Sequence, residues 1–356
     1  PMPIEAGTHA LPLGARRVFR LSLTAALALA FSYALGGGMP YLAPILALAL
    51  TAPPGPPLPV KALVGLLVLV VVTLGTGLLL VPVLDLYPAV GLLLVALGLF
   101  FSIDLSVNRG KAAAGTFMTM GLTIIPAAGV MSFQAAFGVA ENLFQAIILA
   151  IICQHVVAPF FPEDPVPARP PTPGTEGETS AWIALRTTLI VYPVFLLGLF
   201  DPTTYLPIVM KAVSIGQQGS LLRAREAGRE LLGSTFLGGI FAIVFWFGLK
   251  IHPNLLMFTL WMALLTGIGA ARFYGIVASR FSPSFWNNVL VTMLILVGPA
   301  VADSAGGKDP YRAFAVRMAL FVAVTLYAWA AIAVLEHLRG GRDARRGTSQ
   351  PVPEGS

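Results

Sequence analysis

Residues 61–84 read KALVGLLVLVVVTLGTGLLLVPVL, and this stretch decides the fold class. Only Lys61 is charged, and the apolar residues follow one another without the alternation of a half-buried strand. A membrane-spanning helix needs roughly 20 mostly apolar residues, so the stretch predicts one such helix. Similar runs recur along the chain. They indicate an all-α polytopic membrane protein rather than a transmembrane β-barrel.

The composition of the whole chain agrees with this interpretation. Of 356 residues, 57% are hydrophobic and 11% are charged, whereas soluble domains carry roughly 25% charged residues. So few charges do not cover the surface of the two or three soluble domains that the length alone would suggest. The single cysteine, Cys153, excludes intrachain disulfides and metal clusters built from cysteines.

The sequence predicts about twelve transmembrane helices, six on each side of a linker rich in Pro, Gly, Glu and Thr, a composition that does not pack. The expected segments are an N-terminal cytoplasmic segment (1–15), a first six-helix unit (16–158), the Pro-rich cytoplasmic linker (159–180), a second six-helix unit (181–339) and a cytoplasmic tail (340–356). The predicted spans are 18–38, 41–52, 61–84, 87–104, 111–131, 140–158, 181–200, 204–218, 229–250, 253–271, 284–301 and 313–337.

Lys and Arg residues are distributed unevenly between the two sides of this arrangement. Of the 22, 17 lie at or near the termini, the linker and the even-numbered loops, and four lie on the other side. Because cytoplasmic loops carry an excess of positive charge, both termini are predicted to be cytoplasmic. The net charge of +6 therefore reports mainly orientation, and no nucleic-acid partner is expected.

The two six-helix units resemble each other in the order of their residues. An even number of spans per unit gives both units the same orientation, so we predict two parallel repeats related by an axis along the membrane normal. The matching positions are Arg20 with Arg186, Tyr41-Leu42-Ala43-Pro44 with Tyr205-Leu206-Pro207, Lys61 and Gly65 with Arg229 and Gly233, and Thr119 and Pro126 with Thr292 and Pro299.

The second predicted span of each repeat, 41–52 and 204–218, is short and bordered by Pro or Gly. In transporters, short helices at corresponding positions of two repeats point to the substrate site, because their freed backbone groups line a cavity or are buried in protein. The alternative interpretation is a short, tilted helix that packs inside the bundle.

The third span of the second repeat opens with RELLGSTFLGG at residues 229–239. Together with the doubled six-helix plan, this opening resembles the fusaric-acid-resistance (FUSC) or aromatic acid exporter family, whose motif is basic-x-x-Gly-Thr-x-x-Gly after a short second helix. Here one more residue precedes Gly233, and Ser234 stands before Thr235. Many members carry a large cytoplasmic domain between the halves; this chain has only the linker and is similar to the compact members.

The resemblance implies export of aromatic or other amphipathic organic acids through the bacterial inner membrane, driven by the proton gradient. It also implies a periplasmic membrane-fusion adaptor as a partner. Plant relatives with one six-helix unit pair around an anion pore, so an organic-anion channel is a second hypothesis. A membrane assembly subunit or lipid-processing protein is a third, which would require a converging polar cluster that the sequence does not show. A homo-oligomer is compatible with each hypothesis.

Lys211 is the basic residue that orientation does not explain, because it lies inside the short span 204–218. Ionisable side chains within a bilayer are functional candidates by default, since their insertion is costly. An ammonium group there would attract a carboxylate substrate. Alternatively, Lys211 extends to the cytoplasmic interface near Gln217. The corresponding residues 47–49 of the first repeat are apolar, so any such site is asymmetric.

Three further charged residues are candidates for gating or proton coupling. Arg317 and Glu141 occupy roughly corresponding outer positions in the last spans of the two repeats. Two interpretations stay open for them: a gate or proton-linked pair that faces across the repeat axis, and, with at least equal weight, a structural salt bridge or simple interfacial placement. Asp104, at the cytoplasmic end of the fourth span, is the other candidate for proton coupling; a solvated span end is its alternative.

Polar side chains inside the spans are candidates for the substrate path. Thr119 and Thr292 each precede a proline by seven residues, and a kinked helix with a hydroxyl can line a path. Alternatively, each hydroxyl bonds the carbonyl one turn back. Asn287 and Asn288 point about 100° apart and cannot share a face; helix–helix hydrogen bonds explain such amides equally well. The matched Tyr41 and Tyr205 complete the set.

The sequence contains no Walker-type phosphate loop, HExxH zinc motif or Rossmann glycine signature. Its four histidines are scattered over the termini and span ends. We therefore expect a protein that is not an enzyme and has no catalytic residue, metal site or cofactor. Membrane lipid and a small organic anion are the expected partners.

Overall fold

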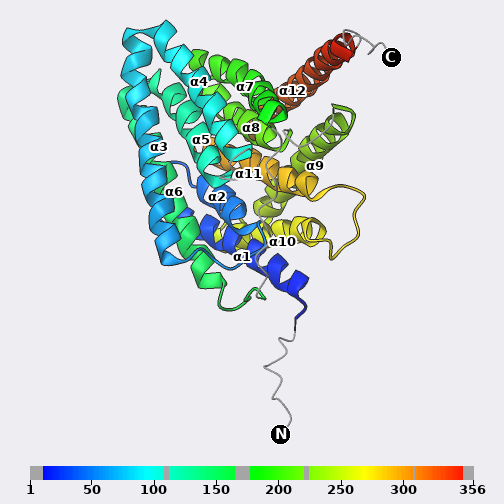
Figure 1. The fold of residues 1–356 in the computed structure, drawn as a ribbon. Helices are drawn as coiled ribbons and strands as arrows, with labels where there is room; N and C mark the ends of the chain where they lie inside the picture. The colour runs from blue at the N-terminus through cyan, green and yellow to red at the C-terminus, as the bar shows by residue number, and fades with distance from the viewer. Residues whose placement is uncertain (1–10, 108–111, 165–176, 220–223, 308, 348–356) are drawn as a thin grey trace, which may run out of the picture.

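The computed structural model describes residues 11–107, 112–164, 177–219, 224–307 and 309–347, and these residues form twelve helices and no strand (Figure 1). The helices are α1 (Leu13–Ala34), α2 (Leu42–Thr51), α3 (Val60–Leu86), α4 (Pro88–Val107), α5 (Ala112–Gly129), α6 (Phe133–Val157), α7 (Gly177–Phe200), α8 (Pro202–Gly219), α9 (Ala224–Ile251), α10 (Leu255–Phe273), α11 (Pro283–Ala305) and α12 (Pro310–Gly347).

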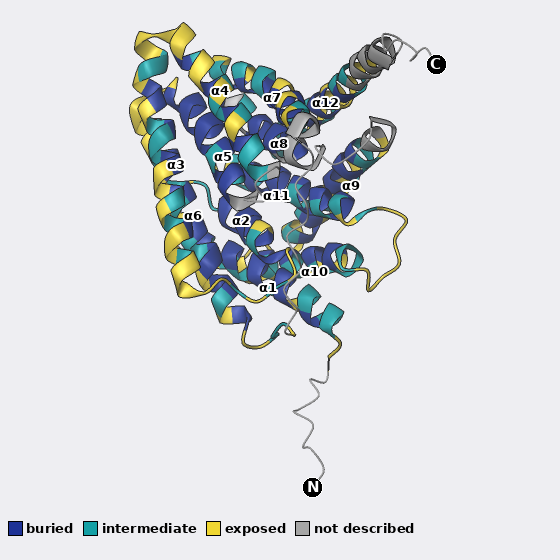
Figure 2. Ribbon diagram, in the orientation of Figure 1, coloured by how far each residue is buried: buried dark blue, intermediate teal, exposed yellow. Residues whose placement is uncertain are grey.

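Eight of these helices are long and apolar enough to cross a membrane: α3, α4, α6, α7, α9, α10, α11 and α12. Helix α2 and the segment Ala114–Gly129 of α5 are apolar but shorter. On α3, the side chains of Val64, Val68, Val71 and Val72 are exposed, and exposed residues follow this helix along its length (Figure 2). Large exposed apolar surfaces mark interaction sites. Here they fit contact with lipid, so the chain is a multi-pass membrane protein.

Proline and glycine set the boundaries that the hydrophobic runs left uncertain. Helix α1 begins after Pro12 and ends before Gly36, whose φ of 71° is the left-handed conformation that glycine adopts easily. The observed helix α1 therefore begins and ends about four to five residues before the predicted span 18–38. Helix α2 stops after ten residues because the sequence PPGPP at 53–57 supplies too few backbone donors to continue it.

The two second helices differ in length, which corrects the expectation that both are short. Helix α8 has 18 residues and α2 has ten. At 1.5 Å per residue, α8 is about 27 Å long and nearly crosses a bilayer core. No proline run stops α8 as PPGPP stops α2, and Pro207 is accommodated within it. Helices α6 and α7 also begin earlier than predicted, at Phe133 and Gly177, and α12 continues to Gly347.

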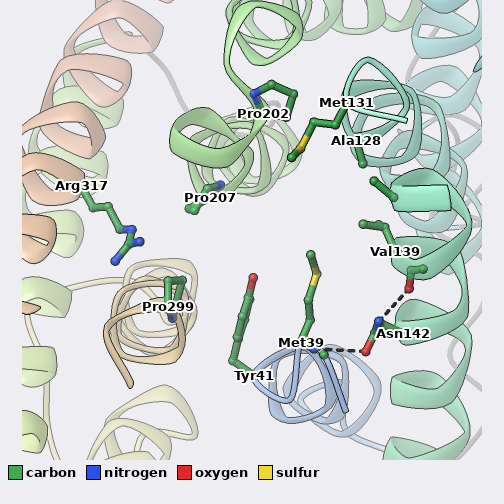
Figure 3. Close-up of a pocket in the computed structure, with 13 residues that line it drawn as sticks. Met39, Tyr41, Ala128, Met131, Val139, Asn142, Pro202, Pro207, Pro299 and Arg317 are labelled. Carbon is green, nitrogen blue, oxygen red and sulfur yellow. Dashed lines mark hydrogen bonds between the residues drawn. The ribbon is translucent and has the colours of Figure 1, made fainter. Parts of the chain in front are cut away.

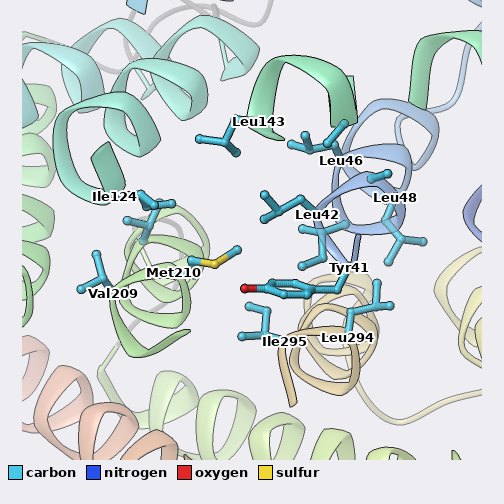
Figure 4. Packing of buried hydrophobic residues seen from close by; sticks show 14 of the residues in the cluster. Tyr41, Leu42, Leu46, Leu48, Ile124, Leu143, Val209, Met210, Leu294 and Ile295 are labelled. Atoms are coloured by element: carbon cyan, nitrogen blue, oxygen red, sulfur yellow. The ribbon is translucent and has the colours of Figure 1, made fainter. Parts of the chain in front are cut away.

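Four helices meet at the centre of the bundle: α2, α5, α8 and α11. Figure 4 shows their apolar side chains, with Leu143 of α6, facing one another around Tyr41. The members drawn there are all less than a tenth exposed, among them Leu42, Ile124, Met210 and Leu294. Helix α11 is the most enclosed of the long apolar helices in the described part of the chain, and most of its residues from Phe285 to Ala300 are buried. A polar side chain on these helices must therefore find a partner inside the protein.

The packing also joins the beginning of the chain to its end. Helix α1 packs against α10, and α4 packs against α7. Within each half, α3 packs against α5 and α9 against α11. Small residues permit these approaches. A Cβ at Gly121 would lie 2.6 Å from the carbonyl oxygen of Thr73, and one at Gly238 would lie 2.6 Å from the Cβ of Thr292.

Candidate functional site

A cavity of about 330 Å³ lies where the ends of several helices converge. Figure 3 shows Tyr41, Met39, Met131, Pro207 and Arg317 around this space, contributed by helices that are distant in sequence. The complete lining consists of Gly38, Met39, Tyr41, Ala128, Met131, Ala135, Gly138, Val139, Asn142, Pro202, Pro207, Pro299 and Arg317. The volume falls within the ~300–1,000 Å³ range of small-molecule sites, and a mostly apolar wall with few polar groups is typical of them.

The polar amide in the cavity wall, Asn142, is held by hydrogen bonds within the protein. Asn142 Oδ1 accepts a hydrogen bond of 3.1 Å from the backbone N–H of Met39, and its Nδ2 donates one of 2.7 Å to the carbonyl of Gly138. This side chain therefore fixes the turn between α1 and α2 against α6. Tyr41 and Arg317 are the other polar side chains that line the cavity.

Tyr41 stands directly on the backbone of α11. A Cβ placed at Gly298 would overlap the Cβ and Cγ of Tyr41. The ring therefore uses the space that a side chain on α11 would fill, and points between Pro299 and Met39 in Figure 3. Because Tyr41 is only 8% exposed, its position depends on this close contact with glycine.

Lys211 is fully buried, with 0% of its surface exposed. It lies on α8 four residues after the cavity residue Pro207, and positions i and i+4 share a helix face. Its Nζ donates hydrogen bonds to Asn288 Oδ1 (2.8 Å) and Thr292 Oγ1 (2.5 Å), both on α11. The alternative expectation, that Lys211 reaches the interface near Gln217, is wrong: the side chain points into the bundle and is held there.

The partners of Lys211 are neutral, and their own hydrogen bonds lead away from it. Asn288 Nδ2 donates to Ser234 Oγ at 2.5 Å, and Ser234 Oγ donates to the carbonyl of Leu231 at 3.1 Å. Thr292 Oγ1 donates to the carbonyl of Asn288 at 2.6 Å. In the described part of the chain, no carboxylate lies within ion-pair distance of Lys211 Nζ.

The amino group of Lys211 has more hydrogen-bond donors in its charged form than the described residues have acceptors for it. An ammonium group has three N–H donors, and the described residues supply two acceptors. One donor of the charged form is therefore left for a further acceptor. A buried charge without an opposite charge is strongly disfavoured. The site is consequently suited to an anion that brings both the missing acceptor and the missing charge.

The glycine-rich segment 229–239 of α9 packs against α11 and forms one side of the Lys211 site. Gly238 lets α9 approach Thr292, and a Cβ there would also lie 2.9 Å from the carbonyl oxygen of Val289. Ser234 and Thr235 are both fully buried. Residues 229–239, singled out in the sequence by their spacing, thus bring Ser234 within reach of Asn288.

Arg317 has a different partner from the one expected. Its Nη2 forms an ion pair of 2.6 Å with Asp303 Oδ2 on α11, and both side chains are 14% exposed. Glu141 instead is exposed on α6, where Oε1 accepts a hydrogen bond from Gln145. The expected pair of Arg317 with Glu141 is therefore wrong. The reason is reach: Asp303 and Arg317 flank the short connection between α11 and α12.

The structure brings together some of the predicted site residues and separates others. Lys211, Asn288 and Thr292 are in contact, and Tyr41 and Arg317 line one cavity. The remaining candidates are placed elsewhere. The hydroxyl of Thr119 forms a hydrogen bond with Ser102 Oγ and donates one to the carbonyl of Gly115. Tyr205 lines a separate apolar cavity of about 280 Å³ with Tyr327, whereas Asn287 is half-buried on another face of α11 and Asp104 is half-buried on α4.

Two residues of the site were not predicted. Ser234 lies inside the recognised 229–239 opening, so its position was visible but its role required the contact with Asn288. Asp303 was a charged residue at a predicted helix end, close in sequence to Arg317, and that proximity was the available signal. No group of three His, Cys, Asp or Glu side chains in the described ranges is arranged to hold a metal ion.

Comparison with known proteins gives one match. Residues 17–157 match the family described as "Protein of unknown function (DUF2955)", so this part of the chain is similar to that family. The matched range begins in α1 and ends at the last residue of α6. No curated protein and no solved structure matches the chain.

Proposed function

We propose that this protein transports organic anions across a membrane, with Lys211 as an anion-binding residue. The observation that carries the proposal is the buried amino group of Lys211, which has only neutral oxygen partners among the described residues and lies one helical turn from a cavity residue. A carboxylate would supply the missing acceptor and the missing charge. Charge-assisted hydrogen bonds of this kind are among the strong ones.

The cavity favours amphipathic organic acids as the substrate class. Met39, Met131 and the prolines offer apolar contact, while Arg317 presents a cationic group at the same cavity. An aromatic or aliphatic acid matches this combination of an apolar body and an anionic head. The FUSC-like opening of residues 229–239 supports the same substrate class.

The two halves are proposed to be parallel six-helix repeats. The helix contacts support this: α1 packs on α10 as α7 packs on α4, α2 on α6 as α8 on α12, and α3 on α5 as α9 on α11. The family match supports it too, since it covers α1 to α6 and stops there. The transport path would run along the axis between the halves, where α2, α5, α8 and α11 meet.

We propose twelve membrane-crossing or membrane-embedded helices, with both termini cytoplasmic in a bacterial inner membrane. The excess of Lys and Arg on one side supports this orientation. The cavity would then face the periplasm, because its wall includes residues beside the α1–α2, α5–α6 and α7–α8 turns. Export driven by the proton gradient, with a periplasmic adaptor as partner, follows from the resemblance. Asp303 beside Arg317 is a carboxylate placed to take part in coupling.

The test is transport of radiolabelled benzoate by the purified protein reconstituted in vesicles with an imposed proton gradient. We expect Lys211→Met to lower the rate ten- to a hundredfold, because hydrogen bonds to charged groups contribute about 1.5–3 kcal/mol and each ~1.4 kcal/mol is tenfold. Lys250→Met is the matched control. Lys250 is largely exposed, lies in the last turn of α9 and donates a hydrogen bond to Tyr311 Oη, away from Lys211.

Three outcomes separate the hypotheses. Transport that requires Lys211 and collapses with an uncoupler supports proton-coupled export. A benzoate current that requires Lys211 but no proton gradient supports the channel instead. Undiminished transport by Lys211→Met, with Lys250→Met equally active, contradicts the assigned role of Lys211.

A further inference from the structure

Three arginines near the start of α1 hold two carboxylates that follow α6. Arg20 Nη1 lies 3.0 Å from Glu163 Oε2, and Arg17 forms an ion pair with the other oxygen of Glu163. Arg16 Nη2 binds both oxygens of Asp164, at 2.9 and 3.0 Å, and its Nη1 donates to the carbonyl of Pro162 at 2.6 Å. We call residues 160–164 the strap, because they cross from α6 onto the arginines of α1.

The centre of this cluster is buried although it lies at a helix end, whereas the side chain of Asp164 is half-exposed and that of Arg17 is partly exposed. The side chain of Glu163 is 1% exposed and that of Arg20 is 3% exposed. Such burial strengthens each charge–charge interaction relative to water. Three guanidinium groups face two carboxylates, so a positive charge remains, and the N-terminus of α1 adds a partial positive charge.

The arginines also keep unused hydrogen-bond donors. The Nε atoms of Arg16 and Arg20 are buried and have no hydrogen-bond partner among the described residues. Buried donors are normally satisfied, and each that is not calls for an explanation. A site that accommodates more than the present two carboxylates provides one.

The arginine cluster and the cavity lie at opposite ends of α1 and α2. Arg20 is 14 residues from Ala34, the last residue of α1, which corresponds to about 21 Å of helix. Tyr274 lies near Arg20 and Arg17, and its hydroxyl donates a 3.0 Å hydrogen bond to the carbonyl of Ala52, next to the end of α2. Burial raises the pKa of Tyr274 to about 12, so this hydroxyl keeps its proton. Helix α2 thus reaches from the cavity at Tyr41 to the arginine cluster.

We propose that Arg16, Arg17 and Arg20 form a second binding site for a small organic carboxylate, and that the strap occupies it as a tethered competitor. The carboxylates of Glu163 and Asp164 stand where carboxylates of the transported class would bind. Arginine suits this role because its planar guanidinium carries five N–H donors: Arg16 Nη2 binds both oxygens of Asp164, and Arg17 donates to Glu163 Oε1 from both Nε and Nη2. The role as a second station for substrate rests on the proposed function, whereas binding itself does not.

Binding is tested with purified protein in detergent, in a Lys211→Met background that removes the other anion site. Thermal stabilisation by sodium benzoate is compared with that by sodium chloride at equal ionic strength. We expect the double variant E163Q/D164N to reach half-maximal stabilisation at a benzoate concentration at least tenfold lower than its parent. Asp85→Asn, which removes an exposed carboxylate of α3, is the control and should leave that concentration unchanged.

A second variant keeps every charge in place in case the double variant does not fold. The rings of Phe161 and Phe19 stack with centroids 5.5 Å apart, so Phe161→Ala loosens the strap from α1 without altering its carboxylates. We expect a smaller gain in benzoate affinity, abolished by adding Arg20→Gln. Equal benzoate dependence in the parent and both strap variants, or a gain that survives Arg20→Gln, overturns the proposal. Loss of transport in Lys211→Met leaves this result unaffected.

Discussion

Lys211 and Arg317 lie on packed helices, α8 and α12, yet they have opposite kinds of partner. Arg317 has the carboxylate of Asp303 beside it, at 2.6 Å. Lys211 has an amide oxygen and a hydroxyl. A cation beside a carboxylate has its charge balanced within the protein, whereas a buried cation with neutral partners remains available to an anion. This difference is why Lys211, and not Arg317, is assigned the central role in binding.

Asn288→Asp tests that assignment at the level of one atom pair. The substitution keeps the shape of the side chain and places a carboxylate 2.8 Å from Lys211 Nζ, where the amide oxygen now lies. The protein would then carry its own anion at the site. We expect benzoate transport to fall at least tenfold, since the internal carboxylate competes with substrate and repels it.

Ser234→Ala is the companion variant for this measurement. It removes the hydroxyl that accepts from Asn288 but introduces no charge, so only a neutral hydrogen bond of about 1 kcal/mol is lost. Its transport should stay within a few-fold of the parent. If Asn288→Asp transports as well as Ser234→Ala, the charge of Lys211 does not act on the substrate.

Sequence reasoning could identify Lys211 as a candidate but could not identify its partners. An isolated lysine in an apolar run is visible without a structure, because burying it is costly wherever the helix packs. Its partners are not visible, since Asn288 and Thr292 lie 77 and 81 residues away. The same holds for Glu163, which meets Arg17 across 146 residues.

At the scale of helices, α2 is fixed at both ends by residues from other elements. Its N-terminal neighbour Tyr41 packs on Gly298. At its C-terminal end, Gln154 donates to the carbonyl of Leu50 at 3.1 Å, and Tyr274 donates to that of Ala52. These side chains satisfy carbonyls that a helix end leaves without partners. A ten-residue helix can therefore remain ordered inside the bundle.

Gly298→Ala should disturb this arrangement. The new Cβ would overlap Tyr41, and overpacking of this kind costs about 1–3 kcal/mol. We expect a lower melting temperature of the purified protein and weaker benzoate transport, because Tyr41 must leave its place in the cavity wall. Gly75→Ala is the control: it is also inside a helix, a Cβ there meets nothing within 4 Å, and alanine favours helix. A melting temperature for Gly298→Ala equal to that of Gly75→Ala would contradict the contact.

Hydrophobic runs predicted the existence of the helices better than their ends. Every predicted span overlaps a helix, because apolar length is a local property of the sequence. The ends shift wherever a local signal outweighs hydropathy. Helix α6 begins at Phe133, directly after the N-cap residue Ser132, whose side chain accepts from the backbone N–H of Ala135. The apolar run 140–158 alone did not indicate this cap.

At the scale of the whole molecule, the cavity and the arginine cluster lie at opposite ends of a packed centre. The buried side chains of Figure 4, drawn from α2, α5, α6, α8 and α11, pack against one another in this centre. Under the proposed transport function, a cavity at one end and a cluster of ion pairs at the other would correspond to one conformation of an alternating-access cycle. Composition predicted the membrane class, but this asymmetry depends on contacts between distant segments, which sequence patterns do not specify.

If the strap seals the closed end, holding it on α1 should stop transport without unfolding the protein. Phe19 and Phe161 already stack, so a Phe19→Cys/Phe161→Cys variant brings two thiols together across the α1–strap contact. The native Cys153 is buried and is replaced by alanine to avoid side reactions. A short bifunctional thiol reagent should abolish benzoate transport in this variant and leave the single variant Phe161→Cys active after the same treatment. Because the crosslink preserves the present conformation, the melting temperature should not fall. A fully crosslinked protein that still transports benzoate at the uncrosslinked rate would mean that the strap does not move during transport, and the sealed end would have to open elsewhere.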